Sequence, residues 1–267
     1  MPLSRTGEAK LYYEFESSAF ESSAHRSTLV LSNSLGTDIS LWDGQAPEIL
    51  KHFSLLRYDI RGHGRSPVPA GPYSIEQLSR DVLSLLDEMG LRRVHFGGIS
   101  MGGMVGQWLG VHAPERVKSL VLSNTAAQCG EPAFWNQWIE SARQKGMESV
   151  IPLILQDWYS ASYRAAHPDV IARTSEMLRK TNPEGFAACC AAIRDMDHRP
   201  DVGRIRVPTL VVFGQHDQAT PPIAARFLIE SIPGAEELEL PAAHLSCVEA
   251  ESAFTKGVVD FLLRHDA

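Results

Sequence analysis

Short apolar runs alternate along most of the chain with segments of helical periodicity. Runs of strand length lie at Lys10–Glu16, Thr28–Leu31, Ser54–Asp59, Arg93–Ile99, Val117–Ser123, Val207–Phe213 and Glu236–Leu240. Helical periodicity connects most of them, at Trp42–Phe53, Ile75–Met89, Met101–His112, Pro222–Ile232 and Ala250–Arg264. This alternation is typical of a mostly parallel sheet with helices on its faces, so the pattern predicts an α/β fold.

The alternation stops in the middle of the chain. Ala133–Arg199 contains no convincing strand but keeps helical periodicity. Pro152, Pro168 and Pro183 are expected at helix boundaries, because proline cannot donate within a helix. We interpret this segment as a helical lid over the sheet.

The predicted organisation is a core domain of residues 1–130 and 200–267 that is interrupted by a lid domain of residues 131–199. The polar stretch Ser17–Arg26 predicts a turn between the first two strands. The composition fits this plan, because 267 residues, of which 44% are hydrophobic and 21% charged, can bury a sizeable core.

The formal net charge of −7 disfavours a nucleic-acid surface as the main function. It also means that an anionic substrate needs a local cation in its site. The segment Met1–Leu11 lacks the apolar stretch of a secretory signal, and no apolar run reaches the ~18 residues of a membrane span. The cysteines show no metal-ligand spacing, which favours reduced thiols. We therefore expect a cytoplasmic protein with no metal site, no membrane contact and no nucleic-acid partner.

The most informative segment is Gly97–Gly103, which lies between a predicted strand and a predicted helix. A sharp strand-to-helix turn strains its central residue, and Gly98 and Gly102 remove side chains that would collide around it. Such a turn presents the Ser100 hydroxyl at a helix N-terminus, whose dipole favours developing negative charge. Ser100 is the candidate nucleophile, and the Met101 backbone N–H is a candidate oxyanion donor. The alternative is a glycine-rich turn with a capping serine.

A serine nucleophile needs a general base, and histidine is best matched to neutral pH. His244 follows the last predicted strand, and Asp217 follows the strand before it. Both are expected at the carboxyl ends of parallel strands, where ligands bind in such sheets. The order serine, aspartate, histidine supports Asp217 as the acid that orients His244. Asn124 stands near the alternative acid position, after the preceding strand, which favours Asp217 further.

These segments together resemble the 3-oxoadipate enol-lactonases, α/β-hydrolase fold enzymes of bacterial aromatic degradation. The resemblance spans nearly the whole chain and rests on Ser32–Asp38 with Trp42, on the turn Arg61–Ser66, on Gly98–Gly103, and on the neighbourhoods of Asp217 and His244. The triad motifs are shared by the entire superfamily. The segment Asn33–Thr37 is narrower and carries most of the substrate prediction.

The resemblance implies a mostly parallel eight-stranded sheet with the lid inserted after the sixth strand. It implies a second oxyanion N–H from Leu35. The implied reaction is hydrolysis of 3-oxoadipate enol-lactone to 3-oxoadipate in the β-ketoadipate pathway, without metal or organic cofactor. Whether Ser100 forms an acyl-enzyme or His244 directs water onto the lactone stays open, with the acyl-enzyme as the default for a triad.

The implied partner is a small lactone that carries a carboxylate, so the lid is expected to supply a cation. Arg194 ends the most apolar lid helix and is our preferred candidate among the arginines at 143, 164, 173, 179 and 194. Trp135 and Trp138 are candidate walls of the pocket. A solvated arginine and packing tryptophans are equally compatible with the sequence, and oligomeric state is not predicted.

Other functions remain compatible with the motifs. One is a different hydrolase of the same fold, such as a carboxylesterase, a carbon–carbon bond hydrolase or a cofactor-free perhydrolase. Another is a small-molecule receptor that keeps a triad but turns over slowly. Substrate profiles distinguish the hydrolases, and a turnover number well below about 1 s⁻¹ on every ester favours the receptor.

Overall fold

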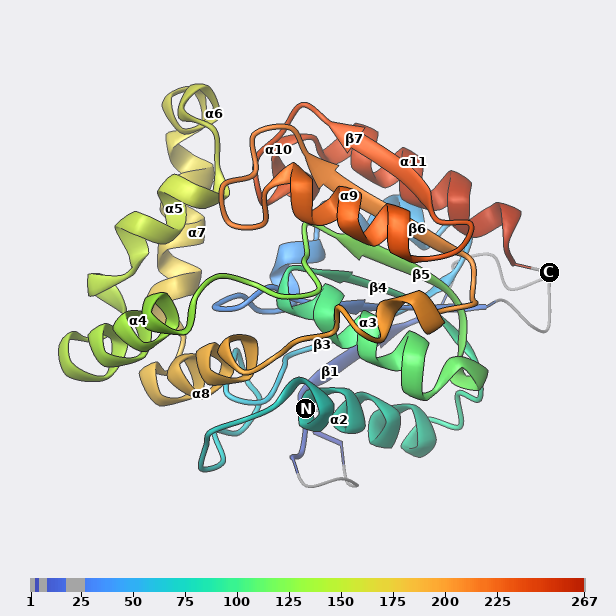
Figure 1. Ribbon diagram of the computed structural model, residues 1–267, viewed down its shortest axis with the longest axis horizontal. Coiled ribbons are helices and arrows are strands. Elements are labelled where there is room, and N and C mark those ends of the chain that lie inside the picture. The colour runs from blue at the N-terminus through green and yellow to red at the C-terminus, as the bar shows by residue number, and fades with distance from the viewer. Residues whose placement is uncertain (1–2, 5–8, 18–26, 267) are drawn as a thin grey trace.

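The computed structural model describes residues 3–4, 9–17 and 27–266, and these form a twisted sheet flanked by helices (Figure 1). Its strands are β1 (Tyr13–Glu16), β2 (Thr28–Ser32), β3 (Ser54–Tyr58), β4 (Val94–Ile99), β5 (Val117–Ser123), β6 (Thr209–Gly214) and β7 (Glu236–Leu240). Their order in the sheet is β1-β3-β2-β4-β5-β6-β7. β1 is antiparallel to β3, and every other pair is parallel.

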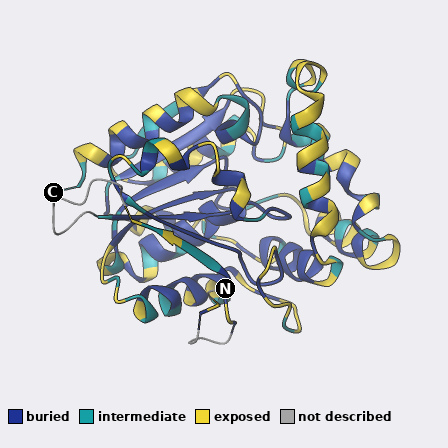
Figure 2. Cartoon of the chain, turned by 180° about the vertical axis from the view of Figure 1, so that it is seen from behind, coloured by how far each residue is buried: buried dark blue, intermediate teal, exposed yellow. Residues whose placement is uncertain are grey.

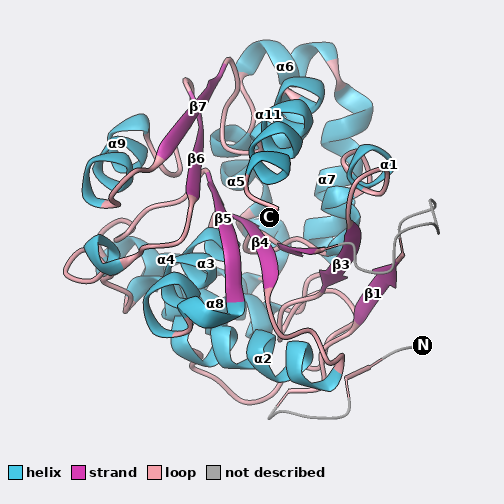
Figure 3. Ribbon diagram, turned by 90° about the vertical axis from the view of Figure 1, so that its right-hand side faces the viewer, coloured by secondary structure: helices cyan, strands magenta, loops and turns pink. Residues whose placement is uncertain are grey.

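Helices cover both faces of the sheet (Figure 3). α1 (Ala46–Ile49) and α11 (Glu251–Arg264) lie on one face, and α2 (Ile75–Glu88), α3 (Met101–His112) and α9 (Pro222–Ser231) lie on the other. The central strands β2, β4 and β6 are buried along their whole length, as apolar strands of a covered parallel sheet must be (Figure 2). The α/β prediction is therefore confirmed.

α2 shows how the sequence specifies these helices. Ser74 caps its N-terminus by accepting a hydrogen bond from the Gln77 N–H at 3.1 Å. Its buried side chains recur at helical spacing, including Ile75, Leu78 and Val82, so one stripe of the helix faces the core. Gly90, with φ 67°, follows the end of the helix, where a left-handed conformation is needed.

A helical segment separates β5 from β6 and lies beyond the carboxyl ends of the strands (Figure 1). It comprises α4 (Pro132–Lys145), α5 (Ile151–Trp158), α6 (Ala161–Ala166), α7 (Pro168–Lys180) and α8 (Pro183–Arg194). Pro152, Pro168 and Pro183 lie in the first turns of α5, α7 and α8, as predicted. α8 is buried along Gly185–Ile193, so this helix is an integral part of the packed molecule.

The strand count differs from the expected eight. Within the described residues the sheet has seven strands, and the helical segment follows the fifth of them, not the sixth. Leu3 contributes only an isolated antiparallel bridge to Tyr12. The Ser4 N–H donates to the Leu11 carbonyl at 2.8 Å, and the Leu11 N–H donates to the Ser4 hydroxyl at 2.8 Å.

The helix predicted over Trp42–Phe53 is also interrupted. A 3₁₀ turn at Ile39–Trp42 is capped by the Asp38 side chain, and the helix α1 begins only at Ala46. The turn predicted at Ser17–Arg26 lies outside the described residues except for Ser17. α10 (Ser246–Glu249) is a short helix that precedes α11. Among the described residues, no helix has both the length and the apolar character that a bilayer crossing needs.

Candidate active site

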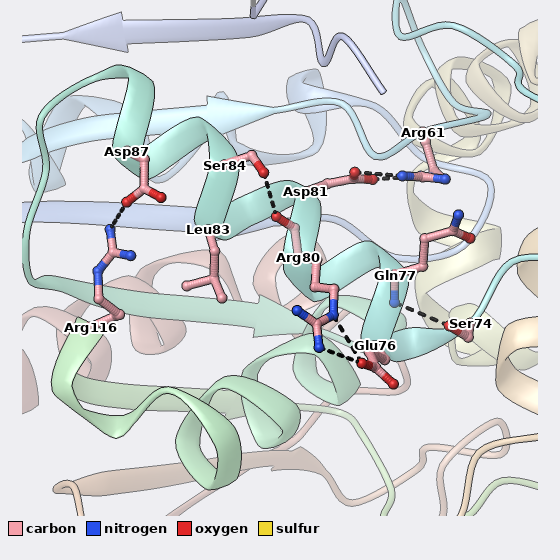
Figure 4. Close-up of a pocket in the computed structure, with 10 residues that line it drawn as sticks. All are labelled: Arg61, Ser74, Glu76, Gln77, Arg80, Asp81, Leu83, Ser84, Asp87 and Arg116. Carbon is pink, nitrogen blue, oxygen red and sulfur yellow. Dashed lines mark hydrogen bonds and ion pairs between the residues drawn. The ribbon is translucent and has the colours of Figure 1, made fainter. Parts of the chain in front are cut away.

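Two cavities of the structure that are large enough for a small molecule differ in the side chains that line them. One of about 780 Å³ runs along α2 (Figure 4), and its charged side chains pair with one another. Both carboxylate oxygens of Asp81 accept from the Arg61 guanidinium at 2.5 Å, for example. Among the described residues, its lining contains no histidine. It therefore offers no imidazole that could activate a serine at neutral pH.

A second cavity of about 460 Å³ holds the residues that the sequence singled out. Ser100, His244 and Leu35 line it from the carboxyl edge of the sheet. Phe134, Trp135, Trp138, Asp157, Trp158 and Ile193 line it from α4, α5 and α8. The cavity thus lies between the sheet and the inserted helices.

Ser100 stands at the strained turn between β4 and α3. Its φ of 56° is unusual for a residue other than glycine. A Cβ on Gly98 would lie 2.1 Å from the Gly102 carbonyl oxygen, and a Cβ on Gly102 would lie 2.3 Å from the Ser32 carbonyl oxygen. Only glycine fits at both positions, which is the physical reason for the glycine pattern. The Thr125 hydroxyl donates to the Ser100 carbonyl at 2.8 Å and holds the turn from outside.

Asp217 and His244 form a buried pair at the ends of β6 and β7. His244 Nδ1 lies 2.9 Å from Asp217 Oδ2 and 3.0 Å from Oδ1. The Asp217 carboxylate also accepts hydrogen bonds from the Ala219 and Thr220 N–H groups and from the Thr220 hydroxyl. Burial alone would raise the pKa of Asp217, but the His244 imidazole and these donors lower it below its ordinary value. The carboxylate is therefore ionised at neutral pH and orients the imidazole.

Asn124 completes this arrangement, and the sequence did not assign it a role beyond occupying the alternative acid position. Its Nδ2 donates to Asp217 Oδ2 at 2.9 Å and to the Ala243 carbonyl at 3.2 Å, while its Oδ1 accepts from the Ser246 hydroxyl at 2.5 Å. Asn124 has φ 43° and is fully buried. It ties Asp217 to the loop that carries His244. The sequence feature that could have indicated this role is the position of a polar residue directly after a buried strand.

The loop after β2 is fixed on several sides. Asn33 accepts from Trp42 Nε1 at 2.8 Å and donates to the Tyr58 carbonyl at 3.0 Å. The Gly102 N–H donates to the Asn33 carbonyl at 3.0 Å, which ties the loop to the first turn of α3. Leu35 and Met101, the candidate oxyanion donors, thereby lie on two segments that are joined next to Ser100.

His63 is a support for this loop, not a member of the cavity lining. Its Nε2 accepts from the Gly36 N–H at 2.7 Å. Burial lowers the pKa of His63 to about 4, although the Arg61 carbonyl and Asp38 oppose that shift. The imidazole is therefore neutral at pH 7 and keeps Nε2 as an acceptor. The Thr181 hydroxyl, at the end of α7, donates to the carbonyl of the same Gly36 at 2.9 Å.

The predicted lid residues separate into two groups. Trp135 and Trp138 line the cavity, and their rings contact each other edge to face with centroids 5.9 Å apart. Arg194 is absent from the lining. Its guanidinium lies against both Asp195 oxygens, at 2.7 and 2.8 Å, and Asn136 Oδ1 at 2.8 Å. The structure does not bring Arg194 into the cavity, because α8 buries its preceding residues and ends with this side chain turned outward to an acid.

As far as the structure describes the chain, the cavity lining contains two carboxylates, Glu131 and Asp157, and neither lysine nor arginine. Burial raises the pKa of Asp157, and Asp217 raises it further, while His244 and Arg164 oppose the shift. Cys129 also lines the cavity, and burial raises the pKa of its thiol to about 12. Cys129 is therefore a neutral thiol at pH 7 and a poor nucleophile. No cluster of metal-binding side chains occurs in the described parts of the chain.

Comparison with known proteins identifies the family. A family model of the alpha/beta hydrolase fold matches residues 27–146. The protein 3-oxoadipate enol-lactonase 2 of Acinetobacter baylyi is 38% identical over 235 residues, which are 88% of this chain and 88% of that protein. The chain belongs to the enol-lactonase family of α/β hydrolases. It is therefore a hydrolase that acts on ester bonds, as the sequence predicted.

Further members agree with this family placement. The 3-oxoadipate enol-lactonase 1 of the same organism is 31% identical over 226 residues, 85% of each chain. The crystal structure of the enol-lactonase from Burkholderia xenovorans LB400 is 42% identical and superposes with a TM-score of 0.95, covering 98% of this chain and 100% of that one. The likeness extends over the whole described fold, including the inserted helices.

Asn124→Gly should lower kcat while leaving KM nearly unchanged. Glycine tolerates the positive φ, so the variant loses mainly the amide that holds Asp217. A hydrogen bond to a charged group contributes about 1.5–3 kcal/mol, so we expect roughly a 10- to 100-fold loss of kcat on an aryl ester. Ser246→Ala, which leaves the Asn124–Asp217 bond in place, should lose much less. Wild-type kcat in the glycine variant would remove Asn124 from the positioning of the acid.

His63 should make the fold less stable in mild acid. Its folded pKa lies below its ordinary value of 6.5, so its contribution is complete above that pH and is lost as the pH falls toward 4. His63→Gln keeps an acceptor for the Gly36 N–H but does not titrate. Between about pH 7.5 and about pH 5, wild type should lose about 2 kcal/mol more unfolding free energy than the variant. Urea unfolding measures this, and equal losses would contradict the neutral assignment.

Proposed function

We propose that this chain hydrolyses 3-oxoadipate enol-lactone to 3-oxoadipate, with Ser100 as nucleophile, His244 as general base and Asp217 as the acid that orients it. The observation that carries the proposal is the buried Asp217–His244 pair beside a cavity that Ser100 also lines, in a chain whose relatives are named for this lactone. We place the reaction in the β-ketoadipate pathway and the protein in the cytoplasm.

The proposed chemistry follows from these side chains. Ser100 Oγ attacks the lactone carbonyl carbon and passes its proton to His244 Nε2, while the N–H groups of Leu35 and Met101 bind the oxyanion. The ring C–O bond then breaks, and His244 gives the proton it took from Ser100 to the leaving oxygen, which departs as an enol and tautomerises to the ketone. Water, deprotonated by His244, cleaves the acyl-enzyme, and Ser100 regains its proton. No step calls for a metal or an organic cofactor.

We propose that residues 131–199 act as a lid on a core of residues 1–130 and 200–267. Trp135 and Trp138 then form walls that exclude water from the reacting carbonyl. Low polarity strengthens the electrostatic interactions within the cavity, and tryptophan supplies rigid apolar area. Substrate selection would depend on these helices, and the bond-breaking chemistry on the loops of the sheet.

The substrate's carboxylate meets an unusual environment in this cavity. Glu131 and Asp157 are acids, and the described residues of the lining include no lysine or arginine. Arg194 could serve as the clamp only if its guanidinium exchanged Asp195 for the substrate. A carboxylate that enters must otherwise rely on neutral donors, or on protonation of Asp157, whose pKa is raised.

The enol-lactone should be a better substrate than a simple aryl acetate. We expect a clearly higher kcat/KM on the lactone, and loss of both activities by several orders of magnitude in Ser100→Ala, because triad members act as a unit. Absorbance assays with both compounds measure this. If the protein hydrolyses the aryl ester but not the lactone, it is another esterase of the same fold. If the Ser100→Ala variant keeps more than a few per cent of the activity, the nucleophile is a different residue.

Asp157→Asn should improve use of the anionic lactone. Removing a like charge from the cavity is worth about 1 kcal/mol at a screened separation, so kcat/KM on the lactone should rise roughly fivefold. The neutral aryl acetate should change little, and the ratio of the two substrates corrects for any effect on His244. The gain should vanish at low pH, where Asp157 is protonated.

Arg194→Met tests whether Arg194 binds the substrate's carboxylate. A loss of kcat/KM that is confined to the lactone would make that arginine the clamp.

A further inference from the structure

The Ser34 hydroxyl is an unusual group in this structure. Its residue is 1% exposed, and its Oγ has no hydrogen-bond partner among the described residues. Buried hydroxyls are nearly always paired, because losing hydration without a new partner costs stability. An exception beside a reaction centre suggests that the partner is a group of the substrate.

The missing partner does not reflect a loose loop. The Ser34 carbonyl accepts from both the Thr37 N–H, at 3.2 Å, and the Thr37 hydroxyl, at 2.8 Å. Asn33 and Gly36, the neighbours on either side of Ser34–Leu35, are held by Trp42 and His63. The backbone that carries Ser34 is therefore fixed, and its hydroxyl can reach a group bound in the cavity by rotation about the side chain's χ1 bond.

The residue Ser34 belongs to the lining of the cavity that holds Ser100. His244 lines the same cavity, and Ser34 directly precedes Leu35. The hydrogen bond from the Gly102 N–H to the Asn33 carbonyl joins its loop to the turn after Ser100. Hydroxyl side chains serve as oxyanion donors elsewhere in enzymes, alongside backbone N–H groups.

We propose that the Ser34 hydroxyl is a third donor of the oxyanion hole, which gives its hydrogen bond to the carbonyl oxygen of the bound ester. The proposal rests on the role proposed above for Ser100 but not on the identity of the lactone. The bond strengthens as the oxygen gains negative charge, because charge-assisted hydrogen bonds are stronger than neutral ones. Ser34 therefore acts mainly in the transition state, and its loss should lower kcat more than it raises KM.

Ser34→Ala tests this proposal, with Ser123→Ala as a matched control. The Ser123 hydroxyl is likewise buried and without a partner in the described structure, but it lines a separate apolar void with Trp42 and Phe254. Both variants remove an unpaired buried hydroxyl, so neither should lower the melting temperature. Ser34→Ala should lower kcat about 100-fold on the lactone and on an aryl acetate, with KM changed less than about threefold. Ser123→Ala should keep wild-type kcat.

Each other outcome overturns the assignment. Wild-type kcat in Ser34→Ala would leave the hydroxyl without a catalytic role. A loss of kcat that follows a lowered melting temperature would make it a packing residue. A raised KM on the lactone alone would make it a ground-state contact to the carboxylate. The role of Ser34 can be measured on the aryl acetate alone. If the protein does not hydrolyse the lactone, that result therefore counts against the proposed substrate and not against the role of Ser34.

Discussion

The close approach between the first turn of α3 and the backbone of Ser32 and Asn33 is the constraint on which the site depends. A Cβ at Gly102 would meet the Ser32 and Asn33 carbonyl oxygens at 2.3 and 2.9 Å, so only glycine permits the contact. The Gly102 N–H uses this proximity to donate to Asn33. The contact fixes the loop of Ser34 and Leu35 relative to Ser100. The geometry of the proposed oxyanion hole therefore depends on the packing of two backbone segments.

The proposed acid and base depend on a second constraint, the burial of charge at the sheet's edge. A buried carboxylate is tolerated only when its oxygens are satisfied. Asp217 meets this condition through Asn124, Thr220 and the N–H groups that follow it, and His244 then provides the remaining donor. These donors make the pair rigid and keep Asp217 ionised. The residues that hold Asp217 therefore belong to the proposed catalytic site, and Thr220 also lines the cavity.

The sequence predicted the parts of the molecule that obey local rules. The glycine pattern around Ser100, the capping serine of α2 and the prolines at helix starts each have a local physical cause, and each was placed to within a few residues. Asn124 could not be assigned its role, since its function depends on Asp217 and Ser246, which are distant in sequence. Arg194 was chosen because an apolar helix precedes it, but burial of that helix says nothing of where its last side chain turns. The eight strands that the resemblance implied are not matched, because the described residues form a sheet of seven.

The inserted helices contact the loop after β2 as well as the substrate cavity. Gly36, two residues after Ser34, is held through its N–H by His63 and through its carbonyl by Thr181. A Cβ there would meet Leu178 of α7 at 2.7 Å, and Phe186 of α8 lies just beyond. Trp138, which lines the cavity, stacks on that same Phe186 with centroids 6.1 Å apart. α8, which contributes Ile193 to the cavity lining, therefore also lies against the loop of the proposed oxyanion donor Leu35. A change in cavity shape is expected to alter the oxyanion geometry, so specificity and rate share one set of contacts.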